Sequence, residues 1–408
     1  QHCGRQGARR PRRAAVMDPA RQEFLGYRRP DGRVGIRNYV AVLPNGYVAD
    51  QVCRLVPETR SFVTDFGSGH TPRDDAAYRR VLVGFGRNPN VAAVVLVNGD
   101  ERLAEEIARD GGPEVALLSA HSCHGTFGLL AAATEAARRL VHQASRLRRE
   151  PAPASTLTVA VKCGASDTTS GIAGNPTVGV AFDRLVAQGG TALFGETTEV
   201  IGAEHLVKGR CASEQVAARL LAAVERIEQR ALGTGLDIRG INPMPSNIAG
   251  GISTLEEKSL GAIKKAGSAP ILGVLDYAEA VPRERPGLYF VDNWQHALSI
   301  QLGYAAAGAQ LVIYQLGGTN TAPGSVLSPS GGPVAPLLWA TANPDTARNA
   351  ATSIDFSSAS VLRGDTTIGE AGERLWQLVL EAASGSLLWS ETLAYLPATT
   401  VYAQDPVF

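Results

Sequence analysis

The sequence predicts an α/β protein made of two α/β domains with largely parallel sheets. Short runs rich in Val, Leu and Ala alternate with longer segments of helical periodicity, and this alternation is typical of parallel βαβ units. Gly-rich and polar stretches follow several of the apolar runs. Because open parallel sheets bind ligands at the carboxyl ends of their strands, we expect Gly-rich loops at strand ends to form the site.

The first domain is expected over residues 25–149. Its predicted strands are Tyr39–Leu43, Val94–Val97 and Val115–Leu118, and its predicted helices are Asp74–Gly84 and Thr126–Leu147. Residues 1–24 are interpreted as a disordered basic leader, because residues 1–16 carry five arginines and no acidic residue.

A Pro/Ala/Ser stretch at 150–156 is interpreted as a linker to a C-terminal catalytic domain over residues 157–408. The strands expected there are Leu157–Val161, Thr191–Phe194, Ile271–Val274 and Gln310–Tyr314. The expected helices are Pro176–Gln188, Ser213–Gln229 with Ser213 as N-cap, Gln295–Ala307 and Glu370–Ala383.

Composition argues against several classes of protein. The 39 basic and 39 acidic residues balance, and removing the five arginines of residues 1–16 leaves 34 basic against 39 acidic. This predicts no nucleic-acid surface on the folded part. No apolar run reaches 18 residues, so no membrane span is expected. Five scattered cysteines form no CxxC pair, which argues against a disulfide framework or zinc knuckle and favours a cytoplasmic location.

The densest polar stretch of the chain is Asn247–Gly261. Its Gly-Gly pair exposes backbone N–H groups that can bind a carboxylate or oxyanion, and acid/base side chains follow within a few residues. The alternative is the solvated first turn of a helix, with carboxylates placed favourably for the helix dipole. We predict catalysis by Glu257 and Lys258, and substrate binding by Asn247, Gly250, Gly251, Ser253 and Thr254.

A second polar stretch follows the predicted strand Leu157–Val161. A lysine at a strand end can neutralise a substrate carboxylate or act as a base if burial lowers its pKa. We predict catalysis by Lys162 and Asp167, and substrate binding by Cys163, Gly164, Ser166 and Asn175. The alternatives are a salt-bridged lysine beside a turn and a small packed thiol.

Arg37 and Asn38 precede the first strand of the first domain, and we expect both to bind substrate. Arg37 can hold a carboxylate through two parallel hydrogen bonds. A structural arginine–carboxylate pair explains its position equally well.

A metal site is suggested by His121 and His124, which flank Cys123 near a strand end. Asp100 and Glu101 follow a neighbouring strand and complete a candidate ligand set. The alternative is that both histidines are structural.

Four motifs together resemble the altronate/galactarate dehydratase family. They are Gly26–Asn38, Lys162–Pro176, Asn242–Gly261 and Gly308–Val312, and the resemblance covers about residues 24–385. It implies a hydro-lyase that removes water from a sugar acid to give a 2-keto-3-deoxy acid, with a divalent metal, commonly Fe²⁺. One branch of the family eliminates sulfite from sulfolactate, and there a small β-rich domain is a separate subunit.

The chain departs from the family pattern at several positions. Family cysteines correspond here to Tyr47–Val48, Gly69, Asp100 and Ala262, and an arginine is lost from the loop Gln315–Thr319. We therefore expect β-elimination from a hydroxy acid. The scaffold and the anion-binding motifs are retained, whereas the residues expected to bind the metal and to select the substrate are changed. The alternatives are a lyase that expels sulfite or another group and a non-catalytic ligand-binding paralogue. A small β-rich companion subunit or a homo-oligomer is the expected assembly.

Overall fold

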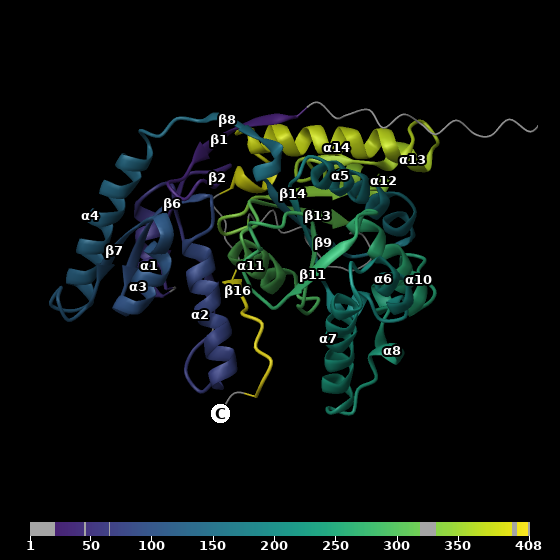
Figure 1. The fold of residues 1–408 in the computed structure, drawn as a ribbon, viewed down its shortest axis with the longest axis horizontal. Coiled ribbons are helices and arrows are strands. Elements are labelled where there is room, and N and C mark those ends of the chain that lie inside the picture. Colours follow the sequence, from purple (N-terminus) through teal and green to yellow (C-terminus); the bar gives the residue numbers. More distant parts are fainter. Residues whose placement is uncertain (1–20, 45, 65, 319–331, 394–397, 407–408) are drawn as a thin grey trace, which may run out of the picture.

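The protein contains two open parallel sheets joined by shared helices, as the computed structural model shows for residues 21–44, 46–64, 66–318, 332–393 and 398–406 (Figure 1). The predicted α/β class with largely parallel sheets is confirmed. The leader prediction lies outside the described residues as far as residue 20, and from Glu23 onward that segment begins strand β1.

The sheet of the first domain has the strand order β4-β3-β6-β7, with every pair parallel. Its strands are β3 (Tyr39–Leu43), β4 (Thr59–Arg60), β6 (Val91–Val97) and β7 (Glu114–Leu118). Apolar residues of α1 (Tyr47–Leu55) and α4 (Thr126–Ala144) pack on one face. Those of α2 (Pro72–Gly86) and α3 (Glu101–Ala108) pack on the other.

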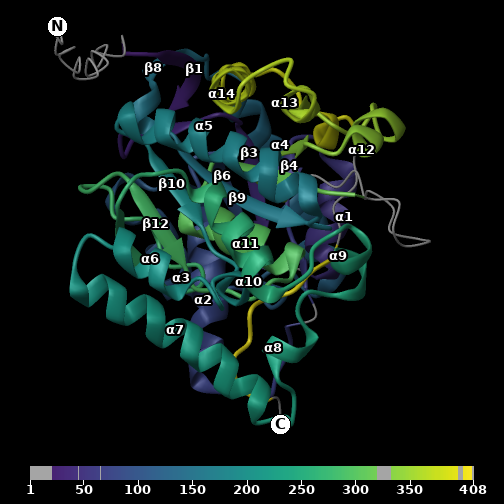
Figure 2. The same ribbon diagram turned by 90° about the vertical axis from the view of Figure 1, so that its right-hand side faces the viewer.

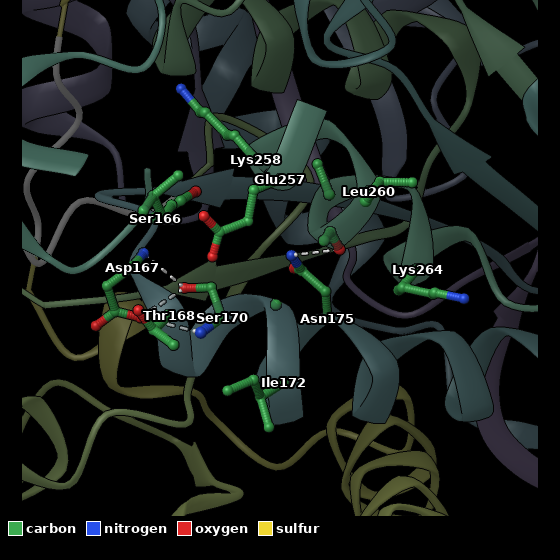
Figure 3. A pocket seen from close by; sticks show the side chains of 14 residues that line it. Ser166, Asp167, Thr168, Ser170, Ile172, Asn175, Glu257, Lys258, Leu260 and Lys264 are labelled. Carbon is green, nitrogen blue, oxygen red and sulfur yellow. Dashed lines mark hydrogen bonds between the residues drawn. The ribbon is translucent and has the colours of Figure 1, made fainter. Parts of the chain in front are cut away.

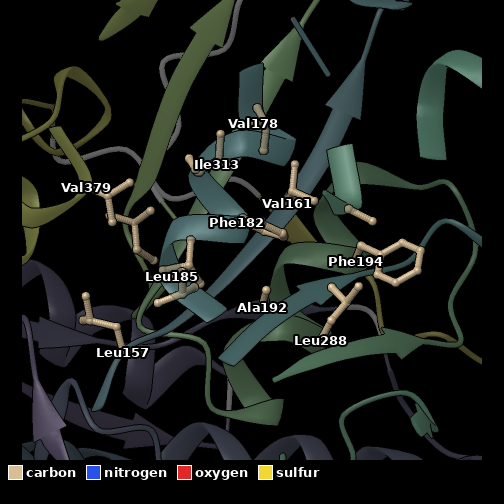
Figure 4. Close-up of a cluster of buried hydrophobic side chains, with 14 of the residues drawn as sticks. Leu157, Val161, Val178, Phe182, Leu185, Ala192, Phe194, Leu288, Ile313 and Val379 are labelled. Carbon is tan, nitrogen blue, oxygen red and sulfur yellow. The ribbon is translucent and has the colours of Figure 1, made fainter. Parts of the chain in front are cut away.

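The second sheet has seven parallel strands in the order β11-β12-β10-β9-β13-β14-β15. Its strands are β9 (Thr158–Gly164), β10 (Thr191–Phe194), β11 (Ile271–Leu275), β12 (Leu288–Val291), β13 (Leu311–Leu316), β14 (Leu337–Thr341) and β15 (Phe356–Ser357). Helices α5 (Asn175–Ala187) and α14 (Ile368–Ala383) cover one face through the apolar cluster drawn in Figure 4. Most side chains in these strands are apolar, as expected for a sheet buried on both faces.

Helix α11 (Ala297–Ala307) covers the other face and packs against α2 of the first domain. The two helices approach so closely that a Cβ on Gly84 would lie 2.1 Å from the carbonyl oxygen of Ala306. One apolar cluster therefore runs from the first sheet through α2 and α11 to the second sheet.

A small antiparallel sheet also connects the two parts. It has the order β2-β1-β8 and consists of β1 (Glu23–Arg28), β2 (Val34–Gly35) and β8 (Glu150–Pro153). The segment 150–156, expected as a linker, is thus ordered as β8 and a 3-10 turn (Ala154–Thr156). The linker interpretation missed this because the pairing partner, β1, is more than 120 residues away in sequence.

Several shorter elements complete the molecule. They are β5 (Val63–Thr64), α6 (Glu204–Arg210), α7 (Glu214–Leu232), α8 (Ile238–Ile241), α9 (Pro245–Ala249), α10 (Leu255–Ala262), α12 (Pro344–Asn349), α13 (Ala359–Leu362) and β16 (Ala398–Thr399). The predicted N-cap is confirmed, because the Ser213 side chain accepts from the Val216 N–H at the start of α7. In the described part of the chain, no helix has the length and apolar character needed to cross a membrane. Figure 2 shows the molecule from the side on which α6, α7, α8 and α10 lie.

Candidate active site

A buried cluster of charged groups lies at the carboxyl ends of β9 and β10. Lys162 and Cys163 end β9, Glu196 and Glu199 follow β10, and Lys265 lies in the short 3-10 turn that precedes β11. Lys162 Nζ donates to Glu196 over 2.7 Å, and Lys265 Nζ donates to Glu199 over 2.7 Å and also to Glu196. The two carboxylates are thereby matched by two ammonium groups in a region closed to solvent.

The thiol of Cys163 lies among these charges. Its Sγ is 3.0 and 3.1 Å from the two Glu199 oxygens and 3.4 Å from Lys265 Nζ. Burial and the two neighbouring carboxylates raise the pKa of the Cys163 thiol to about 12. The sulfur is therefore a protonated donor to Glu199 at neutral pH, and it is a poor nucleophile in this arrangement.

Charge pairing overcomes burial in the pKa values of the cluster. Burial alone lowers the pKa of Lys162, but Glu196 and the other nearby groups raise it above its ordinary value. Burial likewise raises the pKa of a carboxyl, but Lys265, Lys258 and Lys162 hold that of Glu199 well below its usual range. The lysines are therefore cations and Glu199 is an anion at neutral pH, so a depressed lysine pKa does not arise here.

A cavity of about 280 Å³ lies beside the cluster. It is lined by Ser166, Asp167, Thr168, Ser170, Gly171, Ile172, Asn175, Ile252, Glu257, Lys258, Leu260, Gly261, Ala262 and Lys264 (Figure 3). Ser166 links the two regions, because its hydroxyl donates to Cys163 Sγ over 3.5 Å and the residue also lines the cavity.

Lys258 is a buried cation beside this cavity, with 6% of its surface exposed. Its ammonium group donates to the side-chain oxygens of Asn242 (2.8 Å) and Asn247 (3.1 Å), which are neutral amides. Within the described residues, no carboxylate oxygen lies within 4.0 Å of Lys258 Nζ. Lys258 also helps to lower the pKa of Glu199, so its charge is compensated by a carboxylate at longer range and not by a hydrogen-bonded one.

Asp167 and Asn247 hold the loops around the cavity in place. Asp167 accepts from the Ser170 N–H (2.9 Å) and from the Asn343 amide (2.8 Å), while Asn247 donates to the Ser166 carbonyl over 2.9 Å. A Cβ on Gly250 would lie 2.8 Å from Asp167 Cβ, so glycine permits this close approach. These side chains position the backbone, and Asp167 also lines the cavity.

Glu257 stabilises the start of α10 and also lines the cavity. Its carboxylate accepts from the N–H (2.8 Å) and hydroxyl (2.5 Å) of Ser253, and Thr254 is the N-cap of α10. The hydrogen bonds from Ser253 lower the pKa of Glu257, so its carboxylate is ionised. The structure thus assigns Ser253 and Thr254 to the helix start, while the Glu257 side chain reaches towards the cavity (Figure 3).

Arg37 and Asn38 lie apart from the cavity in a structural network. The Arg37 guanidinium donates to both oxygens of Glu391, over 2.6 and 2.5 Å, and both side chains are buried. Asn38 accepts from Arg29 and donates to the Ala144 carbonyl. The structural pair, which the sequence left as an alternative, is the arrangement observed for Arg37.

The candidate metal ligands of the first domain do not come together in the structure. Asp100 caps α3 by accepting from the Leu103 N–H, and it pairs with Arg79. His121 and His124 are exposed in the turn before α4, and Glu101 is exposed in the first turn of α3. These residues are close in sequence, but their side chains do not point to one place. Asp100 caps its own helix, and the other three side chains are exposed to solvent.

In the described part of the chain, the group suited to a metal ion is Cys163, Glu196 and Glu199. A thiolate with two carboxylates suits divalent first-row transition metals in donor type. Lys265 donates to both carboxylates and lies 3.4 Å from the sulfur, so its ammonium group competes with an ion for the same donors. The donor set therefore suits a metal in type, while in this structure the Lys265 ammonium group and the thiol proton occupy the same donors.

Sequence reasoning missed Glu196, Glu199 and Lys265. The segment Gly195–Glu199 directly follows the correctly predicted strand Thr191–Phe194, so two carboxylates after a buried strand were an available signal. Lys265 carried no comparable signal, because its meeting with Glu196 depends on a contact between residues 69 positions apart.

Comparisons with known proteins match nearly the whole described chain. The model of the D-galactarate/altronate dehydratase C-terminal domain matches residues 154–403, and that of the D-galactarate dehydratase/altronate hydrolase second domain matches residues 26–145. The chain is 38% identical to (2R)-sulfolactate sulfo-lyase subunit beta of Chromohalobacter salexigens over 93% of this chain and 97% of that protein. It is also 31% identical to altronate dehydratase of Bacillus subtilis, over 72% of this chain and 62% of that protein. Its identity to altronate dehydratase of Escherichia coli is 30%, over 91% of this chain and 76% of that protein.

Proposed function

This chain belongs to the D-galactarate/altronate dehydratase family, and from this premise we propose that it is a lyase that performs β-elimination on a small 2-hydroxy acid. The observation that carries the proposal is Lys258, a buried residue in the cavity wall whose ammonium group has only neutral amides as hydrogen-bond partners. A substrate carboxylate would supply the hydrogen-bonded anion that Lys258 lacks.

The reaction needs a base, an electrophile and a leaving group. A base removes the proton on C2, the bond between C3 and the leaving group breaks, and the electron pair forms an enol that tautomerises to a 2-keto acid. We assign the base to Glu257, because its carboxylate is ionised and borders the cavity beside Lys258. The raised pKa of Lys162 favours a cationic role over the role of base first expected for it.

The hardest part of this reaction is the negative charge that develops on the substrate carboxylate. The low pKa of Glu257 makes it a weak base, so stabilisation of this charge must contribute most of the rate enhancement. We assign this role to Lys258, which is a buried residue of the cavity wall. Asn242 and Asn247 hold the Lys258 ammonium group in position through their side-chain oxygens.

We also propose that a divalent metal, with Fe²⁺ the leading candidate, is held by Cys163, Glu196 and Glu199 when the protein is loaded. Such an ion supplies a Lewis acid that polarises a substrate oxygen. Metal analysis of protein purified without oxygen, compared with a Cys163→Ala variant, tests this. Equal metal content in the two proteins would contradict the assignment.

The leaving group distinguishes two candidate activities that share the same C2 proton transfer. Sulfite is favoured by the relative that is named a sulfolactate sulfo-lyase subunit and that this chain covers over 97% of its length. Water is favoured by the relatives named altronate dehydratase. Incubation with sulfolactate, altronate and galactarate, assayed for sulfite and for 2-keto acid, separates the two; a non-catalytic ligand-binding paralogue would release neither.

The test of the site itself is Lys258→Met. Loss of a charge-assisted contact predicts a fall in kcat/KM of about tenfold to a hundredfold. Stability is expected to fall by about 1–3 kcal/mol, because the variant loses the hydrogen bonds to Asn242 and Asn247 and a charge that helps to keep Glu199 ionised. Lys208→Met on the exposed surface is the matched control, and wild-type kcat/KM in Lys258→Met would overturn the proposal.

A companion subunit is proposed as well, because the relative from Chromohalobacter salexigens is named a subunit beta. Co-purification of a tagged chain from its native host tests this. Full activity of the isolated chain at every concentration would argue against a required partner.

A further inference from the structure

Asn175 presents an unpaired hydrogen-bond acceptor at the candidate active site. The residue is the first of α5, is 2% exposed and lines the cavity. Its amide nitrogen donates to the Gly261 carbonyl over 3.1 Å, while its Oδ1 is buried and has no partner among the described residues. Buried polar atoms are normally satisfied, and leaving one unpaired costs about 1–3 kcal/mol.

The chemistry of the missing partner follows from the orientation of this amide. The Gly261 carbonyl can only accept, so it selects the orientation in which the Asn175 nitrogen faces it. The free atom is then the amide oxygen, and its partner must carry an O–H or N–H group. A carboxylate cannot satisfy it, but a hydroxyl group can.

The same cavity therefore offers two complementary requirements. Lys258 has no carboxylate among its hydrogen-bond partners, and Asn175 Oδ1 has no hydrogen-bond donor. The cavity volume of about 280 Å³ lies near the lower end of the roughly 300–1,000 Å³ typical of small-molecule sites, which favours a short acid. Both residues line this one cavity, and Figure 3 shows the Lys258 side chain pointing away from Asn175.

We propose that Asn175 Oδ1 accepts a hydrogen bond from a hydroxyl group of the bound acid, and so makes that hydroxyl a requirement for tight binding. This inference rests on the proposed function for the identity of the ligand as a hydroxy acid. Asn175 is then a specificity-determining residue, because an acid without the hydroxyl leaves its oxygen unpaired.

The test uses two probes that lack a leaving group on C3, so that binding is measured without turnover. Lactate, as each enantiomer, and propanoate differ by the hydroxyl alone, and their affinities for the full chain are measured by titration calorimetry or by competitive inhibition. One enantiomer of lactate is expected to bind about tenfold to a hundredfold more tightly than propanoate. Equal affinity of the wild-type protein for all three acids would overturn the inference and would indicate that water satisfies Asn175.

Variants separate recognition from a structural role. Asn175→Leu is expected to bring the ratio of the affinities for lactate and propanoate close to one. Asn175→Asp keeps an acceptor at the same place, and it serves as the second variant if the leucine variant fails to fold. Thr177→Val is the matched control, because the Thr177 hydroxyl is also buried and unpaired on α5 but does not line the cavity. An unchanged ratio in a folded Asn175→Leu variant would refute the assignment.

The outcomes distinguish this inference from the proposed function. Discrimination between lactate and propanoate without lyase activity would retain the hydroxyl site and reject the lyase. Lyase activity without discrimination would do the opposite.

Discussion

Replacement of Lys265 by Met tests whether the buried cluster is held together by charge balance. Lys265 is 1% exposed and pairs with both carboxylates, so its loss leaves Glu196 and Glu199 with Lys162 as the remaining ammonium group in the cluster. A 2.7 Å contact corresponds to an attraction of about 6 kcal/mol at an effective dielectric constant near 20, part of which is offset by desolvation. Removing one partner of a buried pair costs about 3–5 kcal/mol, and we expect the free energy of unfolding to fall by that amount.

The loss should also depend on pH in a defined direction. In the wild-type protein the pKa of Glu199 is depressed, so its contribution to stability is complete above the ordinary carboxyl pKa and is lost as the pH falls below it. Without Lys265, protonation of Glu199 relieves the unbalanced charge. The stability difference between variant and wild type should therefore shrink as the pH falls below the ordinary carboxyl pKa of about 4.5.

Urea denaturation followed by circular dichroism measures both effects. Lys264→Met, at the exposed neighbouring position, is the matched control and should change stability by less than about 0.5 kcal/mol. The double variant Lys265→Met/Glu199→Gln restores the charge balance and should recover about 1–3 kcal/mol. If Lys265→Met is as stable as wild type, or the double variant is no better than the single one, the charge-balance argument is refuted.

Two further predictions concern groups outside the site. Arg37→Leu leaves the buried Glu391 carboxylate unpaired and should lower the free energy of unfolding by about 3–5 kcal/mol without changing KM, and a raised KM at wild-type stability would instead place Arg37 at the substrate. Burial raises the pKa of Asp355 to about 6, so the folded state binds the extra proton and stability should fall by up to about 3 kcal/mol as the pH rises from about 4 to 6. Asp355→Asn should remove this slope in denaturation experiments, and an unchanged slope would show that another group causes it.

The order and type of the main elements could be predicted from sequence because each depends on local periodicity. The strands Tyr39–Leu43 and Thr191–Phe194 match the structure at both ends, and the Ser213 N-cap is a signal contained within a few residues. The polar motifs likewise pointed to a region that the structure brings to one cavity, with Asp167, Asn175, Glu257 and Lys258 in its wall.

The roles of individual side chains were not predictable in the same way. Arg37 looked like a carboxylate binder in sequence, and its carboxylate is Glu391, which lies 354 positions later. Asp100, His121 and His124 looked like metal ligands, but the first caps a helix and the other two face solvent.

By itself, the sequence determined the parallel α/β architecture and the family, because hydrophobic periodicity and motif order are local properties of the chain. It also predicted a candidate site at strand ends. The tertiary structure alone decided which charges are compensated. Lys162 and Lys265 meet buried carboxylates, whereas Lys258 meets neutral amides and Asn175 keeps an unpaired oxygen. Burial makes that difference costly, and it is the physical basis of our proposal that an anionic hydroxy acid binds in the cavity.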